Sequence, residues 1–172
     1  MKKKNNNNNA NKNIAIIAAI VILLGAGIFI PRLFGGGNGG DPAVSGEAIE
    51  GDVIIQKSDI TDTVKFYPVK VGNRNMEILA VKAGDGTIRT AFNTCQVCNG
   101  SPKAYYKQDG DILVCQNCGN QFSMDMVEQQ RGGCNPVPIY KEDKTDEGDN
   151  IVISREFIEQ NKDLFTANWK TK

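Results

Sequence analysis

Four of the five cysteines form two matched pairs, Cys95–Cys98 and Cys115–Cys118, and each pair encloses two residues. Sixteen residues separate the pairs, and the chain contains no histidine. A C-x-x-C turn directs both sulfurs toward one point, and sixteen residues are enough for a hairpin that brings the second turn opposite the first. Gly119 follows the second pair, where a residue without a side chain lets backbone N–H groups approach the sulfur. The spacing predicts an all-thiolate metal site with Cys95, Cys98, Cys115 and Cys118 as ligands.

Four thiolates do not identify their metal. Zinc, a single iron ion and an iron-sulfur cluster all accept them, and the spacing lies within the range of structural zinc sites. In an oxidising compartment the same thiols could form two disulfides instead. Thiol–disulfide exchange is a further alternative, but a redox-active pair normally begins a helix. The residues that follow the pairs, 100–102 and 119–120, do not predict one.

The absence of histidine narrows the possible functions. It excludes His-ligated zinc catalysis, Ser–His and Cys–His nucleophilic sites, and His-ligated haem. The sequence also shows no pair of catalytic carboxylates and no phosphate-binding loop. We therefore expect a metal-binding protein or an electron carrier rather than an enzyme with its own substrate pocket.

The first forty residues of the 172-residue chain do not have a globular composition. Residues 1–13 form a leader rich in asparagine and lysine, and residues 14–30 carry no charge. At about 1.5 Å per residue, 17–21 apolar residues span roughly the hydrocarbon core of a bilayer. We predict a cytoplasmic leader at 1–13, a transmembrane signal anchor at 14–34 and a glycine-rich linker at 35–46.

Two other interpretations of the apolar segment fit less well. A cleaved signal peptide needs an A-x-A-like site, which is missing after the apolar run. A lipoprotein would need a cysteine where Gly27 stands. The four lysines of the leader place the N-terminus in the cytoplasm. We therefore expect a single-pass protein of the cell membrane, held by its N-terminal helix, with residues 47–172 as an extracytoplasmic four-cysteine metal-binding domain.

Charge is distributed unevenly along the chain. All twenty acidic residues lie at or beyond Asp41, together with fifteen of the twenty basic residues. The neutral total therefore conceals a C-terminal domain with an excess of five negative charges. An acidic surface of this kind argues against binding to nucleic acid.

The C-terminal domain has the pattern of a mainly β fold. Runs rich in β-branched residues, separated by Gly, Asn and Pro, predict strands. They lie at 52–55, 63–67, 76–81 and 88–92. A later run at 151–153 predicts another strand, and Ser154 is a suitable N-cap for a short closing helix bearing Phe157, Ile158 and Leu164. The charged residues 141–150 predict a solvated loop.

A hairpin is predicted between the two cysteine pairs. The Asp109-Gly110 dipeptide is a strong turn signal between two short strands, 104–107 and 111–114. This hairpin accounts for the sixteen-residue gap and delivers both pairs to the same end of a sheet. Tyr105 and Tyr106 could shield a metal site from water, or one could pack inward while the other covers an edge.

The segment 95–122 resembles the cluster-binding half of a Rieske domain, in which two ligand loops flank a hairpin. Cys118 stands where the histidine of the second Rieske loop would be, and Cys98 stands near the position of the first. The segment 131–138 resembles the proline loop that covers a Rieske cluster. This resemblance implies a Rieske-like or zinc-ribbon-like β domain.

The chain is also similar to the membrane iron-sulfur FtrD-like family, which is associated with bacterial iron uptake. The similarity is carried by residues 93–98, 114–118 and above all 132–136, within a region of about 50–155. It implies an iron-sulfur centre that serves electron transfer, with zinc as the alternative metal, and a membrane iron permease or a redox protein as partner. Many family members carry the domain at the end of a multi-span membrane region, whereas a single span is predicted here.

Cys134 is the unpaired fifth cysteine. If the proline-loop resemblance holds, Gly132 and Gly133 let the backbone fold tightly over the metal site and bring Cys134 close to it. Cys134 is then a candidate further metal ligand, a disulfide partner for one of the other four, or a small buried core residue.

Overall fold

The computed structural model describes residues 47–171. The predicted leader 1–13, transmembrane segment 14–34 and linker 35–46 lie outside the described residues. Within 47–171, no helix is both long enough and apolar enough to cross a membrane.

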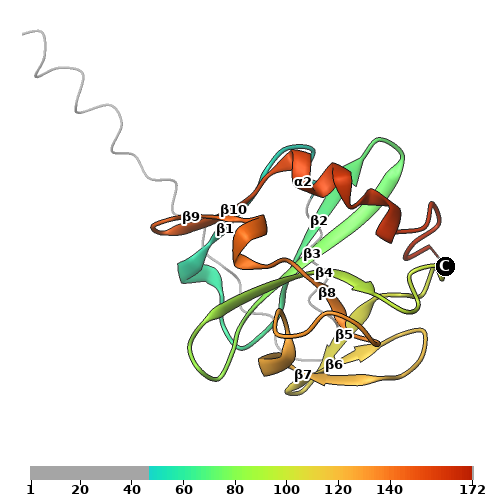
Figure 1. Cartoon of the computed structure of the whole chain (residues 1–172), viewed down its shortest axis with the longest axis horizontal. Helices are drawn as coiled ribbons and strands as arrows, with labels where there is room; N and C mark the ends of the chain where they lie inside the picture. Colours follow the sequence, from blue (N-terminus) through green and yellow to red (C-terminus); the bar gives the residue numbers. More distant parts are fainter. Residues whose placement is uncertain (1–46, 172) are drawn as a thin grey trace, which may run out of the picture. The chain divides into compact units, whose positions relative to one another are not determined.

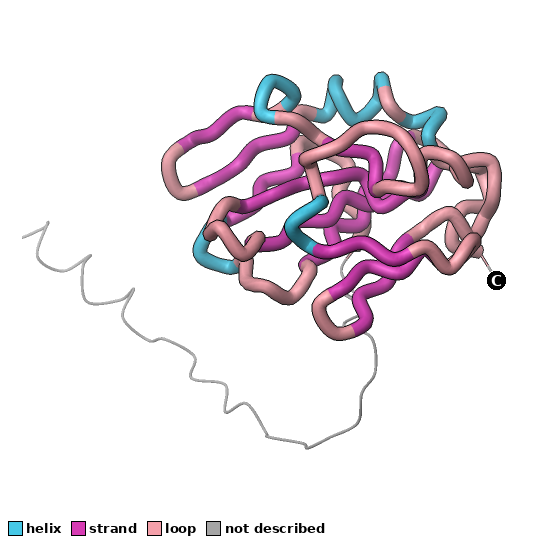
Figure 2. Tube along the Cα trace, turned by 60° about the horizontal axis from the view of Figure 1, so that its bottom comes forward, coloured by secondary structure: helices cyan, strands magenta, loops and turns pink. Residues whose placement is uncertain are grey.

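The described part is mainly β with one short C-terminal α-helix, as the sequence predicts (Figures 1 and 2). Its strands form three small antiparallel sheets with the orders β1-β10-β9, β2-β3-β4-β8 and β5-β6-β7. The strands are β1 (Val53–Gln56), β2 (Lys65–Val71), β3 (Arg74–Lys82), β4 (Ile88–Cys95), β5 (Tyr106–Asp109), β6 (Ile112–Cys115), β7 (Gln121–Ser123), β8 (Pro136–Pro138), β9 (Thr145–Glu147) and β10 (Asn150–Ile153). The helical segments are η1 (Lys57–Asp59), η2 (Met124–Met126), η3 (Lys141–Asp143), α2 (Arg155–Gln160) and η4 (Lys162–Leu164).

Strand β3 is buried on both faces and separates two hydrophobic cores. Side chains alternate between the faces of a strand. Met76, Ile78 and Ala80 accordingly join one core, and Leu79 and Val81 join the other. This double burial explains why residues 76–81 are almost uniformly apolar instead of alternating with polar residues.

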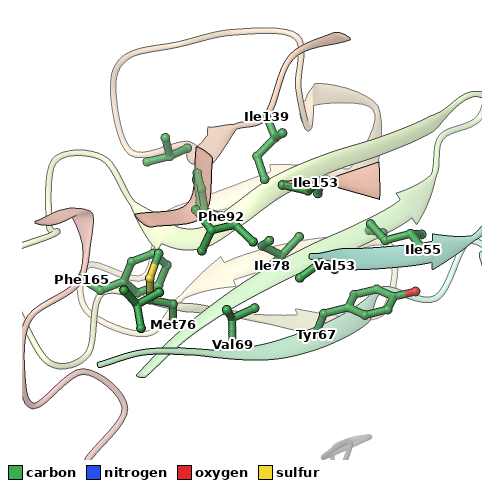
Figure 3. Close-up of a cluster of buried hydrophobic side chains, with 14 of the residues drawn as sticks. Val53, Ile55, Tyr67, Val69, Met76, Ile78, Phe92, Ile139, Ile153 and Phe165 are labelled. Atoms are coloured by element: carbon green, nitrogen blue, oxygen red, sulfur yellow. The ribbon is translucent and has the colours of Figure 1, made fainter. Parts of the chain in front are cut away.

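The first core lies between the four-stranded sheet and the β1-β10-β9 sheet. Figure 3 shows Val53 of β1 and Ile153 of β10 close to Ile78 of β3. Phe165, which follows η4, packs edge-to-face on Phe92 of β4 with 6.0 Å between ring centroids. The second core joins the same central sheet to the β5-β6-β7 sheet and contains two of the cysteines.

The hairpin between the cysteine pairs is confirmed. Asp109 of β5 pairs with Ile112 of β6, so the connecting loop consists of Gly110 and Asp111. Gly110 has a φ of 57°, a conformation that glycine adopts without steric cost. At the open end of the hairpin Tyr106 pairs with Cys115, so β5 begins and β6 ends on the side of the predicted metal site.

The C-terminal segment partly differs from the prediction. Ser154 caps α2 as expected, because its side chain accepts a hydrogen bond from the N–H of Phe157. The helix ends at Gln160, so Leu164 lies in η4 rather than in α2. The prediction of a plain loop at 141–150 was wrong, because this segment contains η3 and the edge strand β9, which pairs with β10. The strand could not be predicted from apolar alternation, because all three residues of β9 are exposed and polar.

Candidate metal centre

Three loops that carry all five cysteines meet at one end of the second core. They follow β4, follow β6 and precede β8. The hydroxyl of Ser101 in the first loop donates to Oδ1 of Asn117 in the second at 2.7 Å. The backbone N–H of Gln96 donates to the carbonyl oxygen of Asn135 in the third loop at 3.2 Å. These hydrogen bonds fix the three loops against one another.

Four sulfurs form a compact group within this junction. The Sγ atoms of Cys95, Cys98, Cys118 and Cys134 all lie within 4.8 Å of one another. Cys95 is buried, Cys98 and Cys134 are half-buried, and Cys118 is exposed. All five cysteines lie among the described residues, and each is a free thiol. The group combines the donor type and the spacing that a thiolate-bound metal requires.

Cys115 does not belong to this group of four. It is only 1% exposed, at the end of β6, and its side chain interacts with that of Cys118. The structure therefore brings three of the four cysteines in the predicted ligand set together, along with Cys134. The sequence identified Cys134 only as a candidate, because its position near the site depends on contacts with distant residues.

A register shift between β4 and β8 sets the direction of the first cysteine turn. Phe92 of β4 pairs with Val137 of β8, whereas Cys95 pairs with the adjacent Pro136, so the register shifts between these two pairs. Extra residues in one strand bend it and redirect its side chains. The backbone N–H of Ser101 then closes the turn by donating to the carbonyl oxygen of Cys98 at 2.8 Å.

The second cysteine turn is closed by its own backbone. The N–H of Gly119 donates to the carbonyl oxygen of Cys115 at 2.8 Å, and the N–H of Cys115 donates to that of Asn120 at 2.9 Å. Gly119 has a φ of 73°, in the left-handed region. A side chain there would strain the turn, which explains the glycine that follows the pair.

The third loop is held over the first by side chains. The N–H of Gly132 donates to Oε1 of Gln96 at 2.6 Å, and Nδ2 of Asn135 donates to the carbonyl oxygen of Gln130 at 3.1 Å. The hydroxyl of Tyr106 donates to the carbonyl oxygen of Cys134. Together these bonds hold Cys134 beside the first cysteine turn.

Tyr106 connects the centre to the core beneath it. Its side chain is fully buried, and its ring packs edge-to-face on Phe122 with 6.0 Å between centroids. Its hydroxyl also lies beside the side chain of Cys95 and interacts with it. Of the two neighbouring tyrosines, Tyr106 is therefore the one that packs inward, whereas Tyr105 is half-buried.

A buried polar network, which was not predicted from the sequence, holds the backbone of Tyr106. Oδ1 of Asn93 accepts the N–H of Tyr106 at 2.8 Å, and its Nδ2 donates to Oε2 of Glu77 at 2.6 Å. Nζ of Lys170 lies 2.8 Å from the same Glu77 oxygen. The one available signal was a glutamate at position 77, within an otherwise apolar strand.

The thiols differ in how readily they ionise. Burial raises the pKa of Cys95, but hydrogen bonds from Tyr106 and from neighbouring thiol and backbone groups outweigh it and hold the pKa below its ordinary value. The pKa of Cys118 is also lowered, because hydrogen bonds from the Asn120 N–H and nearby thiols outweigh burial. Burial raises the pKa of Cys115 to about 12. The pKa of Cys134 also rises to about 12, chiefly through its hydrogen bond with Cys118. Binding a metal through thiols of raised pKa releases protons, so acid disfavours it.

One of the comparisons with known proteins gave a match. Residues 60–165 match the family model described as "Membrane iron-sulfur containing protein FtrD-like", so the match includes all five cysteines. No curated protein and no solved structure matches the chain.

Proposed function

Because this chain belongs to the FtrD-like family of membrane iron-sulfur proteins, we propose that it is an electron carrier whose cysteines bind iron. The observation that carries the proposal is the group of four sulfurs within 4.8 Å of one another. Iron bound by thiolates gains and loses one electron without a substrate-binding step. The thiolates supply soft, negatively charged donors that suit iron.

The position of the four sulfurs supports transfer to an external partner. Cys118 is exposed and Cys98 and Cys134 are half-buried, so the centre lies at the surface. Two surface cavities lie elsewhere: one beside α2, lined in part by Glu156 and Phe157, and one at residues 47–50. Neither is lined by a cysteine. A carrier that exchanges electrons through its surface needs no pocket at the metal.

We further propose that the metal-binding region has a Rieske-like arrangement with thiolates in place of the Rieske histidines. The supporting features are the two cysteine turns after β4 and β6, the hairpin that precedes the second turn, and the Gly132–Pro136 loop that lies against the first turn. The likeness lies in the arrangement of the loops, and four thiolates in this arrangement suit a single iron ion as well as a two-iron cluster.

The proposed location is the outer side of the cell membrane. In this proposal the segment 14–34 anchors the chain, the leader 1–13 is cytoplasmic, and residues 47–172 hold the metal outside. An electron carrier in that position could serve a membrane iron permease or another redox protein. The excess of acidic residues in the C-terminal part suits a partner with a basic surface.

A structural zinc site is the second candidate, and the same sulfur group supports it. Four thiolates around one point also form the tetrahedral site that zinc occupies in structural domains. Zinc has no redox chemistry in proteins, so this candidate excludes electron transfer.

Metal content and redox response distinguish the two candidates. The full-length chain is purified anaerobically in mild detergent, and iron, zinc and the visible spectrum are measured before and after dithionite. We expect bound iron, thiolate-to-iron absorption that bleaches on reduction, and recovery on reoxidation. A colourless, zinc-loaded protein that dithionite does not change would refute electron transfer. A matched variant is Cys95→Ser, which removes a buried member of the sulfur group and should weaken the thiolate-to-iron absorption.

A further inference from the structure

We infer that the metal ligands are Cys95, Cys98, Cys118 and Cys134 around a single ion, and that Cys115 is a neighbouring thiol that does not bind the metal. This inference rests on the proposal that the chain holds a metal, and it deepens that proposal. It replaces Cys115 by Cys134 in the ligand set that the spacing predicts, because the sulfur of Cys134 joins the group of four and that of Cys115 does not.

The separations of the sulfurs support a single ion. Metal–sulfur bonds of about 2.3 Å in a tetrahedral site place the sulfurs roughly 3.8 Å apart. The four Sγ atoms already lie within 4.8 Å of one another, so binding one ion needs only small side-chain movements. In a two-iron cluster the thiolates are divided between two irons with sulfides between them. Opposite thiolates then stand farther apart than sulfurs that share one ion.

The backbone around Cys134 is built to hold it at the site. Gly132 and Gly133 have φ angles of 102° and 70°, which turn the chain sharply just before the cysteine. Gln96, from within the first cysteine turn, accepts the Gly132 N–H through its side chain and donates its own N–H to Asn135. These contacts involve residues on both sides of Cys134 in the chain, and they join its loop to the Cys95–Cys98 turn.

Cys115 has the surroundings of a core residue. It is the last residue of β6, paired in the ladder with Tyr106, and it is 1% exposed. It belongs to the hydrophobic cluster that contains Leu113 and Phe122. A free buried cysteine commonly behaves as a small apolar side chain. Cys95 is equally buried in the same cluster, so burial does not separate the two; Cys115 differs because its sulfur lies outside the group of four, and we assign it a packing role beneath the centre.

Cobalt(II) provides a probe of the ligand set that does not depend on the native metal. The full-length chain is loaded anaerobically with one equivalent of Co(II), and thiolate-to-cobalt charge-transfer absorption is measured for the wild type, Cys134→Ala and Cys115→Ala. Cys115→Ala should keep the full absorption. Cys134→Ala should keep about three-quarters of it, since one of four thiolates is lost, and should bind cobalt more weakly. The reverse pattern, or equal losses in both variants, would overturn the assignment.

Two further measurements keep the inference testable. Cys134 is half-exposed, so Cys134→Ala decides its role even if the core substitution Cys115→Ala fails to fold. In the native protein we expect one metal ion per chain and no acid-labile sulfide, whereas two irons with sulfide would overturn the single-ion site. If the purified protein holds zinc and shows the expected cobalt pattern, electron transfer is refuted and the ligand assignment stands. If the protein holds iron that is reversibly reduced, but metal binding is lost in Cys115→Ala, the ligand assignment is refuted and electron transfer stands.

Discussion

Replacing Tyr106 by phenylalanine tests how the centre is supported, because it removes one oxygen atom and leaves the ring in place. The hydroxyl donates to the carbonyl oxygen of Cys134 and lies beside the side chain of Cys95. The ring keeps its edge-to-face contact with Phe122. The variant therefore separates the polar role of the side chain from its packing.

The expected loss of stability follows from the loss of a hydrogen bond to a half-buried carbonyl. A hydrogen bond of this kind contributes about 0.5–1.5 kcal/mol. Unfolding entropy is about 2.1 cal/mol/K per residue, or about 0.26 kcal/mol/K for a domain of roughly 125 residues. The melting temperature of Tyr106→Phe should therefore fall by roughly 2–6 °C. The single hydrogen of the hydroxyl can point either to this carbonyl or to Cys95, and when it points to the metal-bound sulfur it raises the reduction potential. The potential of the variant should therefore also fall.

Thermal unfolding followed by circular dichroism, and a redox titration of the metal-loaded full-length chain, measure the two effects. Tyr67→Phe is the matched control. The Tyr67 hydroxyl is also buried and interacts with the ammonium group of Lys65, but it makes no hydrogen bond of normal geometry among the described residues, so its removal should cost less than that of the Tyr106 hydroxyl. If Tyr106→Phe and Tyr67→Phe both melt and titrate like the wild type, the hydroxyl of Tyr106 does not support the centre.

Three other substitutions probe the fold around the centre. Lys144→Met leaves Glu128, which is 14% exposed and 2.5 Å from Nζ of Lys144, without its counter-charge; we expect a loss of about 3–5 kcal/mol in denaturant unfolding. Gly119→Ala forces a side chain into a backbone with φ of 73° and should cost roughly 1–2 kcal/mol by the same assay. Asp85→Asn should lower the melting temperature near neutral pH. Hydrogen bonds from Thr87 and Arg89 lower the folded pKa of Asp85 to about 2, below the unfolded value of about 3.9. Its stabilisation is therefore complete above the unfolded pKa and is lost as the pH falls through about 2.

Each of these predictions has an internal control. Adding Glu128→Gln to Lys144→Met should restore part of the lost stability, and no restoration would argue against a buried charge as the cause. Gly100→Ala has open space around its Cβ and an ordinary φ, so it should be neutral. A Gly119→Ala variant as stable as Gly100→Ala would show that the turn tolerates a side chain. For Asp85→Asn, a melting-temperature difference that persists at pH 2 would contradict the carboxylate explanation.

Residue types and their spacing were enough to predict the local features of this protein. The longer strands, the hairpin around Gly110, the Ser154 cap and the glycine after Cys118 all depend on interactions between residues near in the chain. Backbone φ preferences, side-chain alternation and capping hydrogen bonds act over a few residues, so residue types and spacing are enough to predict them. The C-x-x-C spacing predicted the cysteine turns for the same reason.

The tertiary structure alone decided which sulfurs come together. Cys134 reaches the first cysteine turn through hydrogen bonds with Gln96 and Tyr106, which lie 36 and 28 positions from their partners in the chain. Cys115, although perfectly spaced from Cys118, ends in the packed core beneath the centre. Spacing fixes how two neighbouring cysteines turn. Which four sulfurs converge depends on how separate loops pack on a shared core, and residue spacing does not contain that information.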